Sequence, residues 1–129
     1  MIFIDASFFI AASIKKDQWH TRVLEILPEV TKQDKITSIV VLSEAVTMVG
    51  SLAGGKMGAC LYNYIIDNHE VKFIDKDLST QAMNFFLKYD GVLSFADSIS
   101  LELMKQDKID TIVSFDSDFD KVNGISRIH

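Results

Sequence analysis

Two acidic residues, Asp5 and Asp116, each follow directly on a short apolar run, and two more, Glu44 and Asp97, stand alone in stretches typical of buried helices. Carboxylate oxygens without His or Cys partners select hard cations, Mg²⁺ or Mn²⁺ rather than zinc. An open acidic site of this type holds one or two metals that activate water and stabilise the departing oxygen of a phosphodiester. If folding brings the four acids together, the chemistry they favour is magnesium-dependent phosphodiester hydrolysis.

Glu44 and Asp97 each have a purely structural alternative. Glu44 has apolar neighbours nearly all round, so the alternative is a core salt bridge, but its segment contains no cation, and an unpaired buried carboxylate is very costly. Asp97 stands three residues after Ser94, the spacing of a capping box. On a helical wheel, however, Asp97 falls outside both the core stripe and the sector predicted to face solvent, which comprises Ser98, Glu102 and Lys105. Both acids are therefore predicted to belong to a site.

The acids at the C-terminal end of the chain have an alternative of their own. Asp116, Asp118 and Asp120 alternate as the first three ligands of an EF-hand do. An EF-hand requires Gly at position six and a bidentate Glu at position twelve, where this chain has Lys121 and Arg127. A calcium loop is thus excluded. For Asp118 two roles stay open, that of a metal ligand and that of a turn-forming residue. Asp120 is expected to be solvated.

The length of 129 residues fits one domain, residues 1–129, with a substantial core. The one cysteine, Cys60, cannot form an internal disulfide, and the N-terminus lacks the basic region of a signal peptide, so we expect a reducing, cytoplasmic location. The stretch between Lys35 and Lys56 is too polar for a membrane span. The net charge is 13 − 18 = −5, the wrong sign for binding nucleic acid by general electrostatics.

Short apolar runs alternate with longer amphipathic segments along the whole chain. This alternation predicts an α/β fold of three layers, with helices on both faces of a mainly parallel sheet of about five strands. Ser7 is expected to cap the first helix, which should end near Lys15, and Pro28 is expected to end or kink the second helix early. The predicted strands are residues 2–4, 35–38, 71–74, 111–115 and 125–128, and the predicted helices after the first are residues 18–30, 39–50, 56–68, 78–89 and 94–105.

No competing catalytic motif is present. His20 and His69 do not pair with each other or with Cys60 at a zinc-binding spacing, and the chain has no glycine-rich phosphate loop and no Gly-x-Ser-x-Gly elbow. Asp5 and Asp116, by contrast, follow predicted parallel strands, and ligands bind outside the carboxyl ends of such strands. The acids therefore remain the candidate site.

Four segments carry these acids in order along the chain, namely Ile2-Phe3-Ile4-Asp5-Ala6-Ser7, Glu44 within an apolar helix, Leu93-Ser94-Phe95-Ala96-Asp97-Ser98, and Ile112-Val113-Ser114-Phe115-Asp116-Ser117-Asp118-Phe119 followed by Gly124-Ile125. Their order and spacing resemble the motifs of PIN-domain proteins over nearly the whole chain. The chain's size and motif order are similar to those of the VapC-type toxins of prokaryotic toxin–antitoxin pairs.

The resemblance implies a metal-dependent endoribonuclease that hydrolyses RNA with Mg²⁺ or Mn²⁺. It assigns the catalytic and metal-binding roles to Asp5, Glu44, Asp97 and Asp116, and an auxiliary metal-binding role to Asp118. It also implies that Ser7 or Ser114 holds a metal-bound water, that the protein is a homodimer, and that a small antitoxin inhibits it by wrapping its groove. Because the net charge is negative, RNA would reach the metals along a local basic rim, for which the candidates are Lys15, Lys16 and Arg22.

Three alternatives to a toxin ribonuclease follow from the same residues. A phosphatase of the haloacid dehalogenase type also begins with a strand and an Asp, but it needs a second Asp two residues later, where this chain has Ser7. A PIN-domain RNA-processing nuclease without an antitoxin would keep all four acids. A non-catalytic PIN-like scaffold that binds RNA or another protein would be expected to lose some of them.

Overall fold

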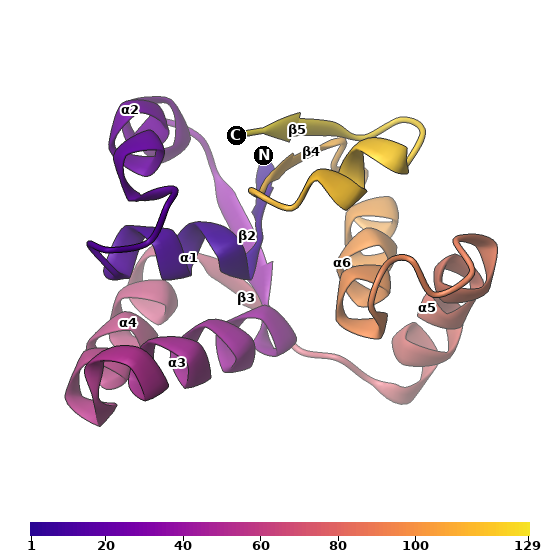
Figure 1. Cartoon of the computed structure of the whole chain (residues 1–129). Coiled ribbons are helices and arrows are strands. Elements are labelled where there is room, and N and C mark those ends of the chain that lie inside the picture. The colour runs from indigo at the N-terminus through magenta and orange to yellow at the C-terminus, as the bar shows by residue number, and fades with distance from the viewer.

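The protein, described over residues 1–129 by a computed structural model, is built on one five-stranded sheet with the strand order β3-β2-β1-β4-β5. Every neighbouring pair of strands is parallel. The first strand of the chain lies at the centre of the sheet, and the last strand lies at one edge (Figure 1). The strands are β1 (Ile2–Ile4), β2 (Lys35–Ser38), β3 (Glu70–Lys72), β4 (Thr111–Val113) and β5 (Ser126–Ile128).

Helices cover both faces of the sheet, so the predicted three-layer α/β fold is confirmed. Helices α1 to α4 lie on one side of the sheet and α5 and α6 on the other (Figure 1). The chain passes to the second side after β3. The reason is that β4 pairs with β1 on the edge opposite to β2, and connections between parallel strands are right-handed, so a connection in the opposite direction lies on the opposite face. The helices are α1 (Ala6–Ser13), α2 (His20–Thr31), α3 (Ile39–Ala53), α4 (Gly55–Asn68), α5 (Lys76–Lys88), α6 (Phe95–Gln106) and the short 3₁₀ helix η1 (Ser117–Lys121).

The central strands are apolar on both faces because both faces are buried. All three residues of β1 are inaccessible to solvent, as are Ile112 and Val113 of β4. Continuous apolar runs of this kind are typical of parallel strands between two helical layers. The edge strands β3 and β5 are partly exposed and more polar.

The carboxyl ends of β1 and β4 lie side by side at the centre of the sheet. From β1 the chain leaves toward β2 on one side, whereas β4 has β5 on the other side, so the strand order reverses between them. A crevice opens at such a reversal and is the usual ligand site of open α/β sheets. Asp5 and Ser114 each follow directly on one of these two strands.

The prediction that Ser7 caps the first helix is wrong. Asp5 is the residue before α1 and makes no side-chain capping hydrogen bond, whereas Ser7 lies inside the helix and bonds to Asp5 and to Ser114 and Phe115 in the loop after β4. Pro28 does not end α2 early, since the helix continues to Thr31, and a kink at Pro28 stays a prediction. The predicted division between the helices of residues 39–50 and 56–68 is confirmed, since α3 and α4 are separated at Gly54. Gly54 adopts a φ of 97°, a conformation that favours glycine.

Two predicted helix faces are also wrong. Ser98 and Glu102 of α6, expected in solvent, are buried because α5 packs against α6. Glu44, expected in a helix buried nearly all round, is exposed: one face of α3 is open and lines a hollow of about 660 Å³. The apolar composition of α3 predicted burial on all sides, but only the face opposite to Glu44 is covered by other elements. No helix is both long and apolar enough to cross a membrane.

Candidate active site

The four predicted acids come together in one pocket of about 310 Å³. We call it the acidic pocket, and it is lined by Asp5, Ala6, Ser7, Ile10, Glu44, Ser94, Asp97 and Asp116. Its acids come from four segments: the end of β1, the middle of α3, the first turn of α6 and the loop after β4. Segments distant in sequence thus place four carboxyl groups at the strand-order reversal.

Asp5 is the buried acid of the pocket, with 7% of its surface exposed. Its Oδ2 accepts hydrogen bonds from the Ser114 hydroxyl at 2.7 Å and the Ser7 hydroxyl at 3.1 Å. Burial raises the pKa of Asp5, the hydrogen bonds from Ser114, the Ala6 backbone and Ser7 act in the opposite direction, and the charge of Asp116 raises it further. The two serines therefore orient the Asp5 carboxyl group and partly stabilise its charge.

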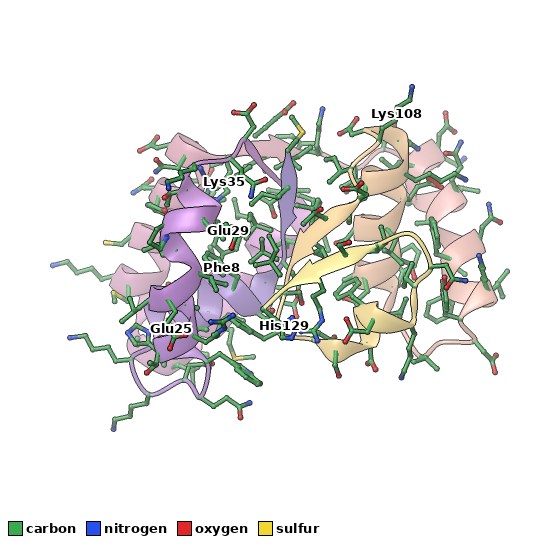
Figure 2. All side chains as sticks on the ribbon, turned by 90° about the horizontal axis from the view of Figure 1, so that it is seen from above. Phe8, Glu25, Glu29, Lys35, Lys108 and His129 are labelled. Atoms are coloured by element: carbon green, nitrogen blue, oxygen red, sulfur yellow. The ribbon has the colours of Figure 1, made fainter.

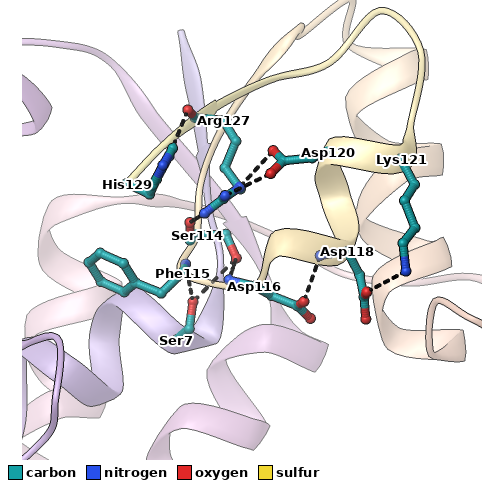
Figure 3. Close-up of polar contacts among 9 residues, drawn as sticks. All are labelled: Ser7, Ser114, Phe115, Asp116, Asp118, Asp120, Lys121, Arg127 and His129. Atoms are coloured by element: carbon teal, nitrogen blue, oxygen red, sulfur yellow. Dashed lines mark hydrogen bonds and ion pairs between the residues drawn. The ribbon is translucent and has the colours of Figure 1, made fainter.

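The same serines fix the loop that carries Asp116, as Figure 3 shows. Ser7 Oγ accepts the backbone N–H of Phe115 at 2.9 Å, and Ser114 Oγ accepts the backbone N–H of Asp116 at 3.0 Å. Asp116 in turn accepts the N–H of Asp118 at 2.9 Å through Oδ1, which starts η1. The hydroxyls expected to hold a metal-bound water are thus engaged in positioning acids, and their role toward water stays a prediction.

Asp97 caps a helix and also lies in the acidic pocket. Ser94 Oγ accepts the N–H of Asp97 at 3.0 Å, and Asp97 Oδ2 accepts the N–H of Ser94 at 3.1 Å, so the capping box is complete. Burial raises the pKa of Asp97 to about 6; the charges of Asp5 and Asp116 add to the rise, and the bonds from Ser94 oppose it. Capping and site membership are therefore compatible, because the helix N-terminus points at the other acids.

Glu44 faces the pocket from α3 and accepts no hydrogen bond. Partial burial of its carboxyl group raises its pKa, and the charges of Asp5 and Asp116 raise it further. Its environment supplies no counter-ion, because none of the ion pairs of the protein involves a pocket acid. Three of the four acids thus hold protons more tightly than free carboxyl groups do, chiefly because of burial and further because of their mutual repulsion. The pocket is also short of positive charge, because no basic side chain pairs with its acids.

A divalent cation fits this shortage and the oxygen-only donor set. As the side chains stand, no three acids are close enough to share one ion directly. Mg²⁺ does not need such a cage, because it usually binds one or two carboxylates and keeps several waters. The pocket therefore fits a hydrated hard cation better than a tightly caged one.

Asp118 and the predicted basic residues lie outside the acidic pocket. Asp118 Oδ1 pairs with Lys121 at 2.9 Å (Figure 3). Arg22 donates to Glu25 and to the backbone oxygen of His129, and Figure 2 shows His129 beyond the end of β5, close to the α2 layer. Lys15 and Lys16 are exposed between α1 and α2. Their auxiliary and RNA-binding roles stay predictions.

Sequence reasoning did not single out two features that support the loop after β4. Arg127 of β5, whose side chain is 7% exposed, donates to the carbonyl oxygen of Ser114 at 3.1 Å and to both carboxylate oxygens of Asp120 at 2.8 Å (Figure 3). Trp19 stacks on Phe115 with ring centroids 5.2 Å apart. An Arg in an edge strand and an aromatic residue in a loop are common in any sequence, so no local pattern reveals these contacts.

Comparison with known proteins gives one family and several solved structures. The sequence pattern of the PIN domain matches residues 2–125. Mycobacterium tuberculosis VapC20, a toxin that cleaves the sarcin-ricin loop, is 24% identical with a TM-score of 0.85, and the match covers 95% of each chain. A chain of a Klebsiella pneumoniae toxin–antitoxin complex is 13% identical with a TM-score of 0.69, and the match covers 98% of this chain and 96% of that chain.

A third structure, Rickettsia felis VapBC2 bound to a DNA fragment from its promoter, gives 13% identity and a TM-score of 0.70 over 99% of this chain and 98% of that chain. At these identities the likeness establishes the fold alone. None of the curated protein sequences matches the chain.

Proposed function

The chain belongs to the PIN-domain family, and on that premise we propose that it is a metal-dependent endoribonuclease and the toxin of a toxin–antitoxin pair. Its fold is shared with VapC-type toxins over nearly the whole length of both chains. Family and fold support a nuclease. The finer parts of the proposal, namely the metal, the RNA substrate and the toxin role, rest on the arguments below.

The observation that carries the proposal is the acidic pocket itself. Asp5, Glu44, Asp97 and Asp116 meet at the carboxyl ends of the central strands without a basic partner among them. Like charges that repel one another destabilise the folded protein. A purely structural role does not account for gathering them, whereas a cation of Mg²⁺ or Mn²⁺ type does.

Each residue of the pocket then has a defined task. Asp5, Asp97 and Asp116 are held in place by hydrogen bonds, and with Glu44 they would hold the cation. When bound, the cation would activate water and stabilise the departing oxygen of the phosphodiester. Ser7 and Ser114 orient Asp5 and the backbone that leads into Asp116. Arg127 holds the same loop from β5.

We also propose an antitoxin and a second copy of the chain as partners, and a cytoplasmic location. The solved structures with this fold include toxin–antitoxin complexes. A hollow of about 310 Å³ between α1, α2 and α4 suits the apolar side chains of a small partner protein, and its lining includes Phe8, Leu24, Leu27, Met57, Leu61 and Tyr64. This surface is not a candidate for RNA binding, because its lining contains no basic residue.

The test is hydrolysis of single-stranded RNA by the purified protein with Mg²⁺, with Mn²⁺ and with chelator. We expect cleavage with either metal and none in chelator. The Asp116→Asn variant should be inactive, because it loses the negative charge that would hold the cation. Its fold should be kept, because the Asn side chain can still accept the hydrogen bond that starts η1. The matched control, Asp77→Asn on α5, should cut as the wild type does. Cleavage that survives in Asp116→Asn or in chelator comes from another site or a contaminant and refutes the proposal.

A panel of phosphomonoesters, assayed under the same conditions, separates a phosphatase from a nuclease. We expect no release of phosphate. Full activity with zinc where magnesium gives none would contradict the assignment of the oxygen ligands to a hard cation.

A further inference from the structure

The loop between α1 and α2 presents one aromatic side chain that packs on the loop after β4. Trp19 is the only tryptophan of the chain, and 40% of its surface is exposed. Its ring lies parallel to that of Phe115, with an interplanar angle of 2° and ring centroids 5.2 Å apart. Phe115 is largely buried. A large apolar ring therefore remains accessible although it is anchored on the core.

The ring is held by its stack on Phe115, and several contacts fix the backbone that carries it. The backbone N–H of Trp19 donates to Asp17 Oδ1 at 2.8 Å, and its carbonyl accepts the N–H of Val23 at 3.0 Å. The next residue, His20, contacts the carbonyl oxygen of Ala11 through Nδ1 at 2.7 Å. A ring held in this way loses little conformational freedom when a ligand stacks on it.

Phe115 links the ring to the acids through the backbone. It lies between Ser114 and Asp116, and its own N–H donates to the Ser7 hydroxyl at 2.9 Å. Asp116 and Ser7 both line the acidic pocket. The Trp19 ring therefore stacks on the residue that directly precedes Asp116, one of the pocket acids. A strand of RNA that ran from the acids across the loop after β4 would pass Phe115 and Trp19.

We propose that Trp19, supported by Phe115, is a stacking subsite for an unpaired nucleobase of the RNA substrate, next to the phosphate that is cut. This subsite rests on the proposed function. Without its cation the acidic pocket repels the phosphate backbone, so a stacking contact, which requires no charge, adds binding energy that the acids do not oppose. A base offers its π-face to any aromatic ring. Lys15 and Lys16, exposed in the same loop, are placed to contact the adjoining phosphates.

The subsite implies a substrate class. A base can stack on a protein ring only when it is free of its own neighbours, so the substrate is a single strand, a loop or a bulge rather than a regular duplex. Stacking tolerates all four bases, so the subsite favours unpaired RNA without imposing a sequence.

The direct test uses the fluorescence of Trp19, because no other tryptophan contributes to the signal. Wild-type protein in chelator is titrated with a short single-stranded oligoribonucleotide of mixed sequence, and binding is followed in parallel by the anisotropy of a dye on the RNA. We expect the Trp19 emission to be quenched with the same midpoint as the anisotropy change. An abasic ribose-phosphate strand of equal length should leave the emission unchanged. RNA that binds without altering the emission overturns the subsite.

Variants test how much the ring contributes. Loss of one stacked base corresponds to about 1–3 kcal/mol of binding free energy. In Trp19→Ala, assayed with Mg²⁺, we therefore expect KM to rise about 5- to 150-fold while kcat changes little. Trp19→Phe should restore most of the affinity, because it keeps a ring on Phe115. Tyr62→Ala, which removes a ring of similar exposure on α4, is the matched control. An unchanged KM in Trp19→Ala overturns the subsite and leaves Trp19 as packing for Phe115 or a contact for a protein partner.

The outcomes for the subsite and for the nuclease are distinguishable. If no metal supports cleavage but RNA quenches Trp19, the proposed nuclease fails and the stacking subsite stands. If RNA is cut but neither quenching nor a change in KM is seen, the nuclease stands and the subsite is refuted. Should Trp19→Ala not fold, the wild-type titration and Trp19→Phe still decide.

Discussion

Asp97 closes the capping box of α6 and lies in the acidic pocket, and a single substitution separates the two roles. In Asp97→Asn the side-chain oxygen can still accept the N–H of Ser94, while the negative charge near Asp5 and Asp116 is lost. We expect this variant to be inactive and, in chelator at neutral pH, more stable than wild type by on the order of 1 kcal/mol. Thermal unfolding in chelator and in Mn²⁺ measures the effect.

Metal should act on the wild type more strongly than on this variant. A ligand at about 100 times its dissociation constant adds ~2.7 kcal/mol to the wild type, and Asp97→Asn should gain less because it has lost a ligand. Asp97→Ala, which removes the cap as well as the charge, is the control for capping. If Asp97→Asn is destabilised in chelator and gains as much from Mn²⁺ as wild type does, Asp97 is a capping residue only.

The stability of the metal-free protein should also depend on pH. The pKa of Asp97 is about 6 in the folded protein and about 3.9 when unfolded. Between these values the folded state binds the proton more tightly, so the stabilisation present below about pH 4 is lost as the pH rises through about 6. The raised pKa values of Asp5 and Glu44 add in the same direction. Chemical unfolding at several pH values should show this decline, and Asp97→Asn should flatten it.

Glu44 is the acid whose removal should leave the fold undisturbed, because its side chain is exposed and accepts no hydrogen bond. Glu44→Gln should lower metal-dependent cleavage by at least about 10- to 100-fold, the loss typical of weakening a metal site, with a change in stability within about 0.5 kcal/mol. Glu29→Gln, an exposed acid of α2, is the matched control. Activity within a few-fold of wild type would remove Glu44 from the site.

At the scale of elements, the pocket depends on the hydroxyl bridge between the ends of β1 and β4. Ser114→Ala would leave the buried Asp5 carboxyl group without its shortest hydrogen bond and the Asp116 backbone N–H without its acceptor. The expected loss of stability in urea unfolding is about 1–3 kcal/mol. Ser100→Ala removes a hydroxyl that is equally buried but bonds only within its own helix, so its effect should be small. Equal effects would mean that the bridge adds no stability.

Elements were predictable where a pattern has one physical cause. A run of apolar residues on both faces needs two covering layers, so β1 was predicted with its observed bounds and β4 with its observed start, although β4 ends at Val113 and not at residue 115. The strand-then-acid pattern placed Asp5 and Asp116 at the carboxyl edge of the sheet. The open face of α3 and the buried Ser98 and Glu102 of α6 were misread, because they depend on which helix packs where. Ser7 was misread as a cap for the same reason: its partners lie 107 and 108 residues away.

For the whole molecule, a net charge of −5 means that the RNA substrate of the proposed nuclease would be drawn by local cations rather than by the overall field. Lys15→Ala with Lys16→Ala should weaken RNA binding and reduce the slope of log affinity against log salt by about 1.4, that is, about 0.7 for each phosphate contact. Lys76→Ala with Lys88→Ala, both exposed on α5, is the control with the same change in charge. An unchanged slope would move the path of the RNA elsewhere.

The order of the strands has a consequence for synthesis of the protein. The hydrogen bond between Asp5 and Ser114 spans 109 residues, and β1 needs β4 as its neighbour on one side. During synthesis Asp5 therefore emerges from the ribosome long before Asp116 and the loop that holds it. The acidic pocket cannot close until β4 and the loop after it have been made, because two of its acids depend on that loop. The topology itself thus delays the proposed activity during synthesis of the chain.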